Sequence, residues 1–226
     1  MSEQHAMGVR LTDELVEGCD TCESDVCLAF SETLVRMAGG VIAGAKPAAI
    51  FNMPMRVYTA GRWRKLSRHV LDEALRTYAG ALPGYGMSMT VLHRTDKRVY
   101  LLVWRPDLLG RTLADVEGLA ILRACGYVGA TVDQLVRELR HRLVAYYLSL
   151  GAGEMTFPHE IGVFLGYPPE DVRGFVEGRV ATCRGAWLAF GDEQAARRRF
   201  SALEAHERRC RTRFASGEPL RALFAG

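Results

Sequence analysis

The segment from Met87 to Pro106, MSMTVLHRTDKRVYLLVWRP, constrains the fold more than any other part of the chain. It contains two runs rich in β-forming residues, separated by the polar turn Thr95-Asp96-Lys97. Such a pattern predicts a β-hairpin, and Pro106 closes it. The second run, Val99 to Trp104, is apolar or aromatic at every position, so both of its faces must be covered. We therefore expect this strand to lie in the middle of a sheet.

Helical periodicity dominates on both sides of the hairpin. Apolar residues recur at helical spacing over about 25–38, which Gly39 and Gly40 are expected to end, and again over about 66–80. Thr131 and Gln134 form a capping-box pattern ahead of a long helix, and Asp192 is placed to cap an Arg-rich terminal helix. A further short strand is expected over 186–190.

This order of elements predicts an α+β fold, a single domain in which a small, mainly antiparallel sheet is packed with several helices. With 226 residues, the chain is long enough to bury about 70% of its unfolded surface. We expect the domain to span residues 25–226, including the Arg-rich C-terminal helix, after a cysteine-containing N-terminal segment at 1–24.

The composition excludes several classes of protein. Hydrophobic residues make up 49% of the chain and charged residues 24%, which is typical of a globular protein and not of a disordered one. A net charge of +3 is too small to indicate nucleic-acid binding. The N-terminus is polar, and no apolar run is long enough to cross a bilayer. We therefore expect a cytoplasmic protein with no membrane partner.

Three of the six cysteines cluster in CDTCESDVC, as Cys19, Cys22 and Cys27. Without a secretory signal, thiols are expected rather than a disulfide framework. A Cys-x-x-Cys pair can bind zinc or an iron–sulfur cluster, but a closed site needs about four ligands. Cys19 and Cys22 are thus metal candidates, with an exposed loop as the alternative. Cys27 shares a predicted helix face with Phe30, Leu34 and Met37, so a buried thiol is expected there.

The segment TFPHEIGVFLGYPPEDVRGFVEG, residues 156–178, carries the other candidate functional residues. Pro158 suits the first turn of a short helix, which would place His159 and Glu160 at the positive end of that helix. An imidazole there tends to stay neutral, so it can accept a proton or bind a metal. Gly162 and Gly166 would share a helix face on which a ligand or a second backbone can come close.

Three interpretations of this segment remain open. It can be a packed corner in a structural or protein-interaction module with no catalytic site. It can instead form a pocket for a small anionic ligand, cofactor or metal, in which a reaction need not occur. In that pocket His159 and Glu160 would be catalytic, and the ligand would be bound by Lys46, Arg105, Tyr167, Gly162 and Gly166.

The third interpretation is a helix-turn-helix-like DNA-binding protein, because the segment has the pattern of two short helices joined by a glycine turn. Glu170 and Asp171 would begin the second helix, where their carboxylates would face a polyanion. Nucleic acid is therefore an unlikely partner.

The same segment resembles a known family. FPHEIGVFLGYPPEDVRGFVE, AGAKPAAIF at 43–51, RVYLLVWRPDLL at 98–109 and GAWLAFGDEQAARRRF at 185–200 resemble the uncharacterised bacterial family 3793 of the domains of unknown function. The resemblance implies a cytoplasmic protein of anaerobic bacteria, linked to iron or redox metabolism, with a redox protein such as a flavodoxin as a partner. It implies no established activity. Family members have a Cys-Ala-Pro-Thr-Leu stretch where this chain has Ala38-Gly39-Gly40-Val41-Ile42, so that cysteine is missing here.

Overall fold

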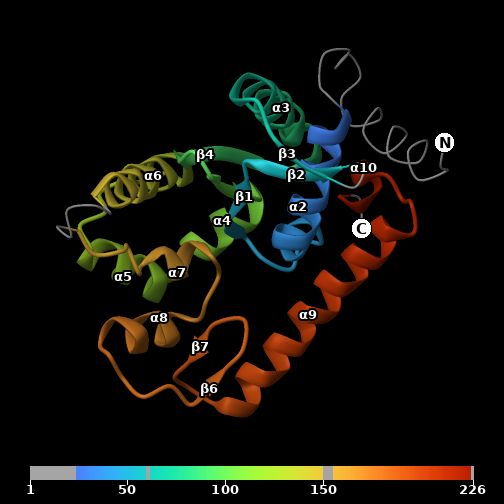
Figure 1. The fold of residues 1–226 in the computed structure, drawn as a ribbon. Coiled ribbons are helices and arrows are strands. Elements are labelled where there is room, and N and C mark those ends of the chain that lie inside the picture. Colours follow the sequence, from blue (N-terminus) through green and yellow to red (C-terminus); the bar gives the residue numbers. More distant parts are fainter. Residues whose placement is uncertain (1–23, 60–61, 150–154, 225–226) are drawn as a thin grey trace. The chain divides into compact units, whose positions relative to one another are not determined.

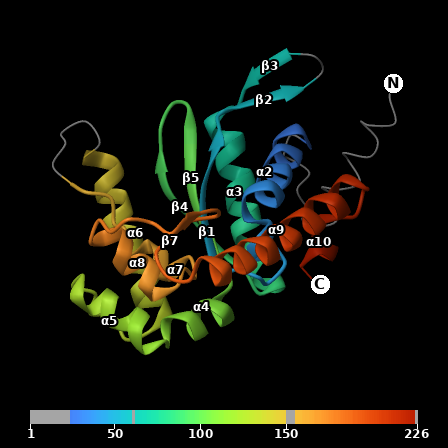
Figure 2. The same ribbon diagram turned by 90° about the horizontal axis from the view of Figure 1, so that it is seen from below.

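The structure is a computed structural model that describes residues 24–59, 62–149 and 155–224 (Figures 1 and 2). The fold class is α+β, as the sequence predicts. The described residues group into two compact units. Among the described residues, the first unit is built from 24–45, 49–59, 62–104 and 205–224, and the second from 46–48, 105–149 and 155–204. The expected domain bounds, 25–226, stay a prediction.

The first unit contains a three-stranded sheet in the order β1-β5-β4 (Figure 2). Its strands are β1 (Ala48–Pro54), β4 (Ser88–Arg94) and β5 (Arg98–Trp104). The hairpin β4–β5 is antiparallel, and β5 lies between the other two strands, as predicted. Leu101, Leu102 and Val103 are buried in succession, so both faces of β5 are covered. A second, unexpected hairpin joins β2 (Arg56–Thr59) to β3 (Arg62–Lys65).

Two helices supply much of the core of this unit, α2 (Ser24–Ile42) and α3 (Arg68–Ala81). The rings of Phe30 and Tyr78 lie 4.3 Å apart, and the Tyr78 hydroxyl donates to the Cys27 carbonyl at 3.2 Å. Cys27 is buried, as its spacing predicts, but it is disulfide-bonded, so the expectation of a free thiol is wrong. The short helix η1 (Leu82–Tyr85) follows α3, and α10 (Leu220–Leu223) lies near the C-terminus.

The helix α2 does not end at Gly39 and Gly40, as the sequence suggested. It continues to Ile42 through a kink at Ala38 (φ −125°). Val41 and Ile42 are fully buried. Burying two such side chains stabilises the fold by about 1.5–3 kcal/mol each. This gain exceeds the cost of about 1 kcal/mol for each glycine in a helix.

The second unit is mostly helical and contains one hairpin whose two strands have two residues each. Its elements are α4 (Pro106–Leu113), α5 (Val116–Ala124), α6 (Val132–Ser149), α7 (Ile161–Phe164), α8 (Pro169–Val176), β6 (Cys183–Arg184), β7 (Leu188–Ala189) and the first part of α9 (Glu193–Ala215). The predicted capping box is present: Gln134 N donates to Thr131 Oγ1 at 3.3 Å, and Thr131 N donates to Gln134 Oε1 at 3.1 Å. Asp192 Oδ1 caps α9 by accepting from the backbone N–H of Gln194 at 2.7 Å.

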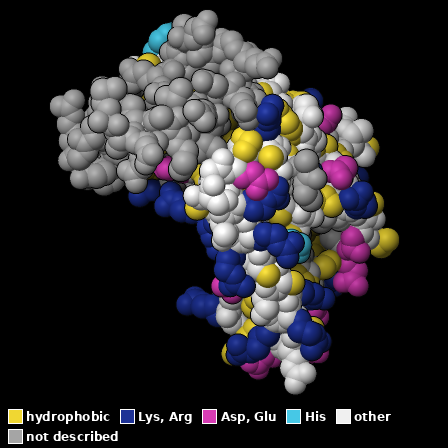
Figure 3. Space-filling view, turned by 90° about the vertical axis from the view of Figure 1, so that its right-hand side faces the viewer, with side chains coloured by type: hydrophobic (Ala, Val, Ile, Leu, Met, Phe, Trp, Pro, Cys, Tyr) yellow, Lys and Arg dark blue, Asp and Glu magenta, His cyan; other side chains and the backbone are white. Residues whose placement is uncertain are grey.

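The Arg-rich helix α9 carries acidic residues among its arginines. Arg197 pairs with Glu193 at 2.6 Å, and Arg211 pairs with Glu207 at 3.8 Å, both one helical turn apart. Figure 3 shows a face on which acidic side chains lie among the basic ones. This mixture of signs is typical of a solvated helix face.

Candidate functional site

The predicted site forms a corner between α7 and α8. The helix α7 begins at Ile161, one residue after Glu160, so His159 and Glu160 lie in the turn before it and not in its first turn. The Pro158 carbonyl accepts from Ile161 N at 3.1 Å and closes this turn. The two candidate catalytic side chains are therefore oriented by a turn and by their neighbours rather than by a long helix.

The two glycines of the corner allow other parts of the protein to come close. A Cβ on Gly162 would lie 2.8 Å from Val172 Cγ2, on α8. Gly166 has φ +77°, and a Cβ there would lie 2.6 Å from Pro47 Cδ. The expectation that both glycines share a helix face is wrong, because α7 ends at Phe164 and Gly166 lies beyond it. Protein side chains, Val172 and Pro47, occupy the space beside both glycines.

The close approach of Pro47 brings Lys46 to the same corner. Lys46 Nζ lies 5.4 Å from the centre of the Tyr167 ring, and the backbone N–H of Arg105 donates to the Pro47 carbonyl at 2.8 Å. The Tyr167 ring stacks on Trp187 with ring centres 4.8 Å apart. Burial raises the pKa of the Tyr167 hydroxyl above its usual value. Lys46, Gly166 and Tyr167 are thus neighbours. Arg105 contacts the same segment only through the hydrogen bond from its backbone N–H to Pro47.

Asp171 ties α8 to the segment around β7. Its carboxylate is 3% exposed and accepts from Trp187 Nε1 at 2.8 Å and from Phe190 N at 2.7 Å. The sequence indicated only that Asp171 begins a helix, and no pattern connects it to a tryptophan sixteen positions away. This carboxylate holds two segments together from inside the unit.

Glu160 belongs to a buried cluster that sequence reasoning missed. Its Oε1 accepts from the Tyr127 hydroxyl at 3.1 Å and lies 3.6 Å from Arg142 NH1. The Arg142 guanidinium also lies over the Tyr127 ring, 4.2 Å from its centre. Burial, and then the charge of Glu160, raises the pKa of the Tyr127 phenol well above its usual value. The same two causes raise the pKa of the nearby Cys125 thiol.

His159 is exposed and lies among aromatic rings instead. Its ring centre is 4.8 Å from that of Phe175 and 5.5 Å from that of Phe157. The row continues through Tyr146, 5.1 Å from Phe157, to Tyr147, 5.5 Å from Tyr146. We call these five residues, Tyr146, Tyr147, Phe157, His159 and Phe175, the aromatic strip. Among the described residues, no hydrogen bond or ion pair joins His159 to Glu160.

The helix-turn-helix interpretation expects two short helices here, and α7 and α8 have four and eight residues. Glu170 is exposed at the start of α8, whereas Asp171 is buried and bonded within the protein. An exposed carboxylate at this position repels phosphate. DNA binding by this pair gains no support from the geometry.

The candidate metal ligands Cys19 and Cys22 lie outside the described residues. In the part of the chain that the structure describes, no group of three or more His, Cys, Asp or Glu side chains is arranged to hold a metal ion. The helices in that same part are too short or too polar to span a membrane.

Comparison with known proteins gives one match. A family model described as "Protein of unknown function (DUF3793)" matches residues 34–224, which include the α7–α8 corner, Lys46 and the aromatic strip. No curated protein and no solved structure matches the chain. Because the family model covers most of the sequence, the chain belongs to the DUF3793 family of proteins of unknown function.

Proposed function

We propose that the chain is a cytoplasmic protein-binding module and that the aromatic strip is its docking surface. The observation that carries this proposal is a row of contacting rings in which His159 and Phe175 are exposed and Phe157, Tyr146 and Tyr147 are half-buried. Phe175 is 44% exposed, its chain neighbour Val176 is 58% exposed, and Met155, two residues before Phe157, is 46% exposed. Exposed apolar side chains that gather in one patch mark protein interaction sites, and aromatic side chains supply most of the binding energy at such sites.

The polar groups beneath the strip support the same proposal. The buried carboxylates of Glu160 and Asp171 accept hydrogen bonds from Tyr127 and Trp187. Gly162 allows α7 and α8 to pack closely. These contacts hold Phe157, His159 and Phe175 on a rigid base. A rigid aromatic surface loses little conformational entropy on binding, which favours affinity.

The partner that fits this surface is a folded protein with an apolar patch and a hydrogen-bonding group opposite His159. The imidazole can donate or accept a hydrogen bond and so set the orientation of the partner. The family resemblance suggests a redox protein such as a flavodoxin, and this is the first partner to test.

The test compares Phe175→Glu with Val116→Glu, since Val116 is an apolar residue of the same unit that is 80% exposed on α5, outside the strip. Binding of each variant to purified flavodoxin from the source organism is measured by isothermal titration. We expect Phe175→Glu to weaken binding by at least about 30-fold, the loss typical of an interface anchor. We expect Val116→Glu to bind like the wild type.

If the wild type and Phe175→Glu bind flavodoxin equally well, flavodoxin does not bind at the aromatic strip. Absence of flavodoxin binding by the wild type would exclude that partner. The strip would then be tested by chemical cross-linking in cells, with each captured protein purified and titrated against both variants. If Phe175→Glu retained every captured protein, the docking proposal would fail.

A second candidate function is binding of a small anionic ligand or cofactor at the corner. It is supported by the position of Lys46 beside Tyr167, because an ammonium group and a phenol hydroxyl can both donate hydrogen bonds to an anion. Among the described residues, no hydrogen bond engages the Tyr167 hydroxyl. Native mass spectrometry of freshly purified protein should then show a bound anion that Lys46→Met loses and Arg198→Met, on α9, retains. Retention by Lys46→Met would rule out this candidate.

A further inference from the structure

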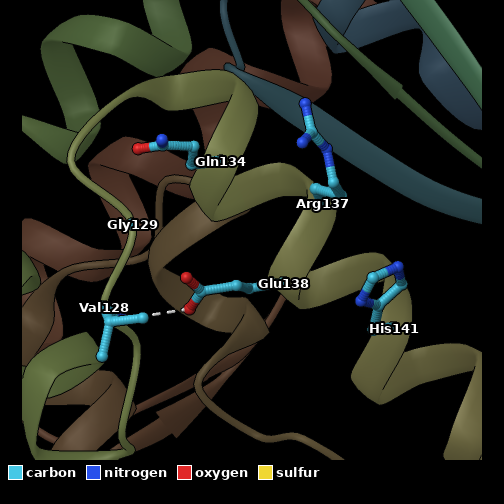
Figure 4. A pocket seen from close by; sticks show the side chains of 6 residues that line it. All are labelled: Val128, Gly129, Gln134, Arg137, Glu138 and His141. Carbon is cyan, nitrogen blue, oxygen red and sulfur yellow. Dashed lines mark hydrogen bonds between the residues drawn. The ribbon is translucent and has the colours of Figure 1, made fainter.

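A concave site, separate in sequence from the α7–α8 corner, lies at the start of α6. It is a hollow of about 240 Å³ lined by Val128 and Gly129 of the preceding loop and by Gln134, Arg137, Glu138 and His141 of the helix (Figure 4). Sites for drug-sized ligands occupy about 300–1,000 Å³. This hollow is therefore of a size for a small metabolite.

The walls of the hollow are held in place by hydrogen bonds between the loop and the helix. Gln134 Oε1 accepts from Ala130 N at 2.8 Å and from Thr131 N at 3.1 Å. Glu138 Oε2 accepts from Val128 N at 3.1 Å (Figure 4). A Cβ on Gly129 would lie 2.9 Å from Gln134 Cβ, so the loop can pass this close only with glycine there. The hollow is thus preformed.

The lining offers hydrogen-bond donors that the protein does not use. Arg137 and His141 are one helical turn apart, and both are exposed. Among the described residues, neither makes a hydrogen bond or an ion pair, and the Gln134 amide NH₂ donates to no other group. These three side chains suit the oxygens of a carboxylate.

The lining also includes a negative charge. Glu138 uses Oε2 to accept from Val128, and no described residue donates to its Oε1. The charges of Arg137 and Glu138 offset each other, so a simple anion would gain little net attraction here. A ligand that carries both a carboxylate and an ammonium group could pair its carboxylate with Arg137 and its ammonium group with Glu138.

We propose that the hollow binds a small zwitterion of the amino-acid class. The carboxylate of the ligand accepts from Arg137 and His141, and its ammonium group donates to Glu138. The Gln134 amide supplies a further donor. None of the residues that line the hollow belongs to the aromatic strip, so this proposal does not depend on the proposed docking function.

The test is a titration of the ¹⁵N-labelled full chain with aspartate and with succinate, which has the same two carboxylates but no ammonium group. We expect aspartate to shift the amide signals of Gly129 and Gln134, and succinate to bind about tenfold more weakly, the loss expected for one charged hydrogen bond. If the two compounds bind equally, or if neither shifts these signals, the proposal is overturned.

Three variants assign the groups. Arg137→Gln should weaken aspartate binding by about tenfold. Glu138→Gln, which keeps an acceptor for Val128 N, should remove the preference for aspartate over succinate. Arg198→Gln on α9 is the matched control, and it should bind aspartate like the wild type. Unchanged aspartate binding by Arg137→Gln would contradict the assignment, whatever the other variants show.

Discussion

Replacing Asp171 with alanine should destabilise the chain by about 3 kcal/mol or more, because two half-buried donors would lose their buried acceptor. Trp187 Nε1 and Phe190 N both donate to this carboxylate, which is 3% exposed. Each unsatisfied buried donor costs about 1–3 kcal/mol. For a chain of this length, the melting temperature should fall by about 6 °C or more.

Urea unfolding followed by tryptophan fluorescence measures this effect, since Trp187 itself contacts the altered group. Asp171→Asn should lose less stability, because the amide keeps one acceptor oxygen for one of the two donors. Glu177→Ala is the control: Glu177 is the exposed residue that follows α8, and its ion pair with Arg179 is on the surface. An unfolding midpoint of Asp171→Ala equal to that of Glu177→Ala would show that the buried hydrogen bonds do not form.

The second large effect is expected for Gly166→Ala, at about 2–4 kcal/mol of destabilisation. The backbone of Gly166 has φ +77°, which costs any residue with a side chain about 1 kcal/mol or more. The new Cβ would also lie 2.6 Å from Pro47 Cδ, and overpacking of this kind costs about 1–3 kcal/mol. Thermal melting measures the sum of both costs.

Gly178→Ala separates the two costs. Gly178 has φ +68°, but no atom lies within 4 Å of the position of its Cβ. Gly178→Ala should therefore lose about 1 kcal/mol of stability, the cost of positive φ alone. If both variants melt at the same temperature, Pro47 does not pack against Gly166, and the proximity of Lys46 to Tyr167 loses its basis.

The sequence by itself determined the features that depend on neighbouring residues. The hairpin β4–β5, its central strand and the long helix α6 follow from the period and length of their apolar runs. The caps at Thr131 and Asp192 were predictable because a capping side chain reaches backbone groups only two or three positions ahead. Their physical cause lies within a few residues, so a short window of sequence contains it.

Only the tertiary structure decided the composition of the candidate site. Glu160 and Tyr127 are thirty-three positions apart, and Asp171 and Trp187 are sixteen apart, so packing alone brings each pair within hydrogen-bonding distance. Packing also separated His159 from Glu160: His159 is exposed and lies among aromatic rings, whereas Glu160 lies in a buried cluster. Packing likewise extended α2 past Gly39 and Gly40, because the burial of Val41 and Ile42 outweighs the low helix propensity of the two glycines. Contacts between distant segments depend on how whole elements pack, which the local pattern of residues does not encode.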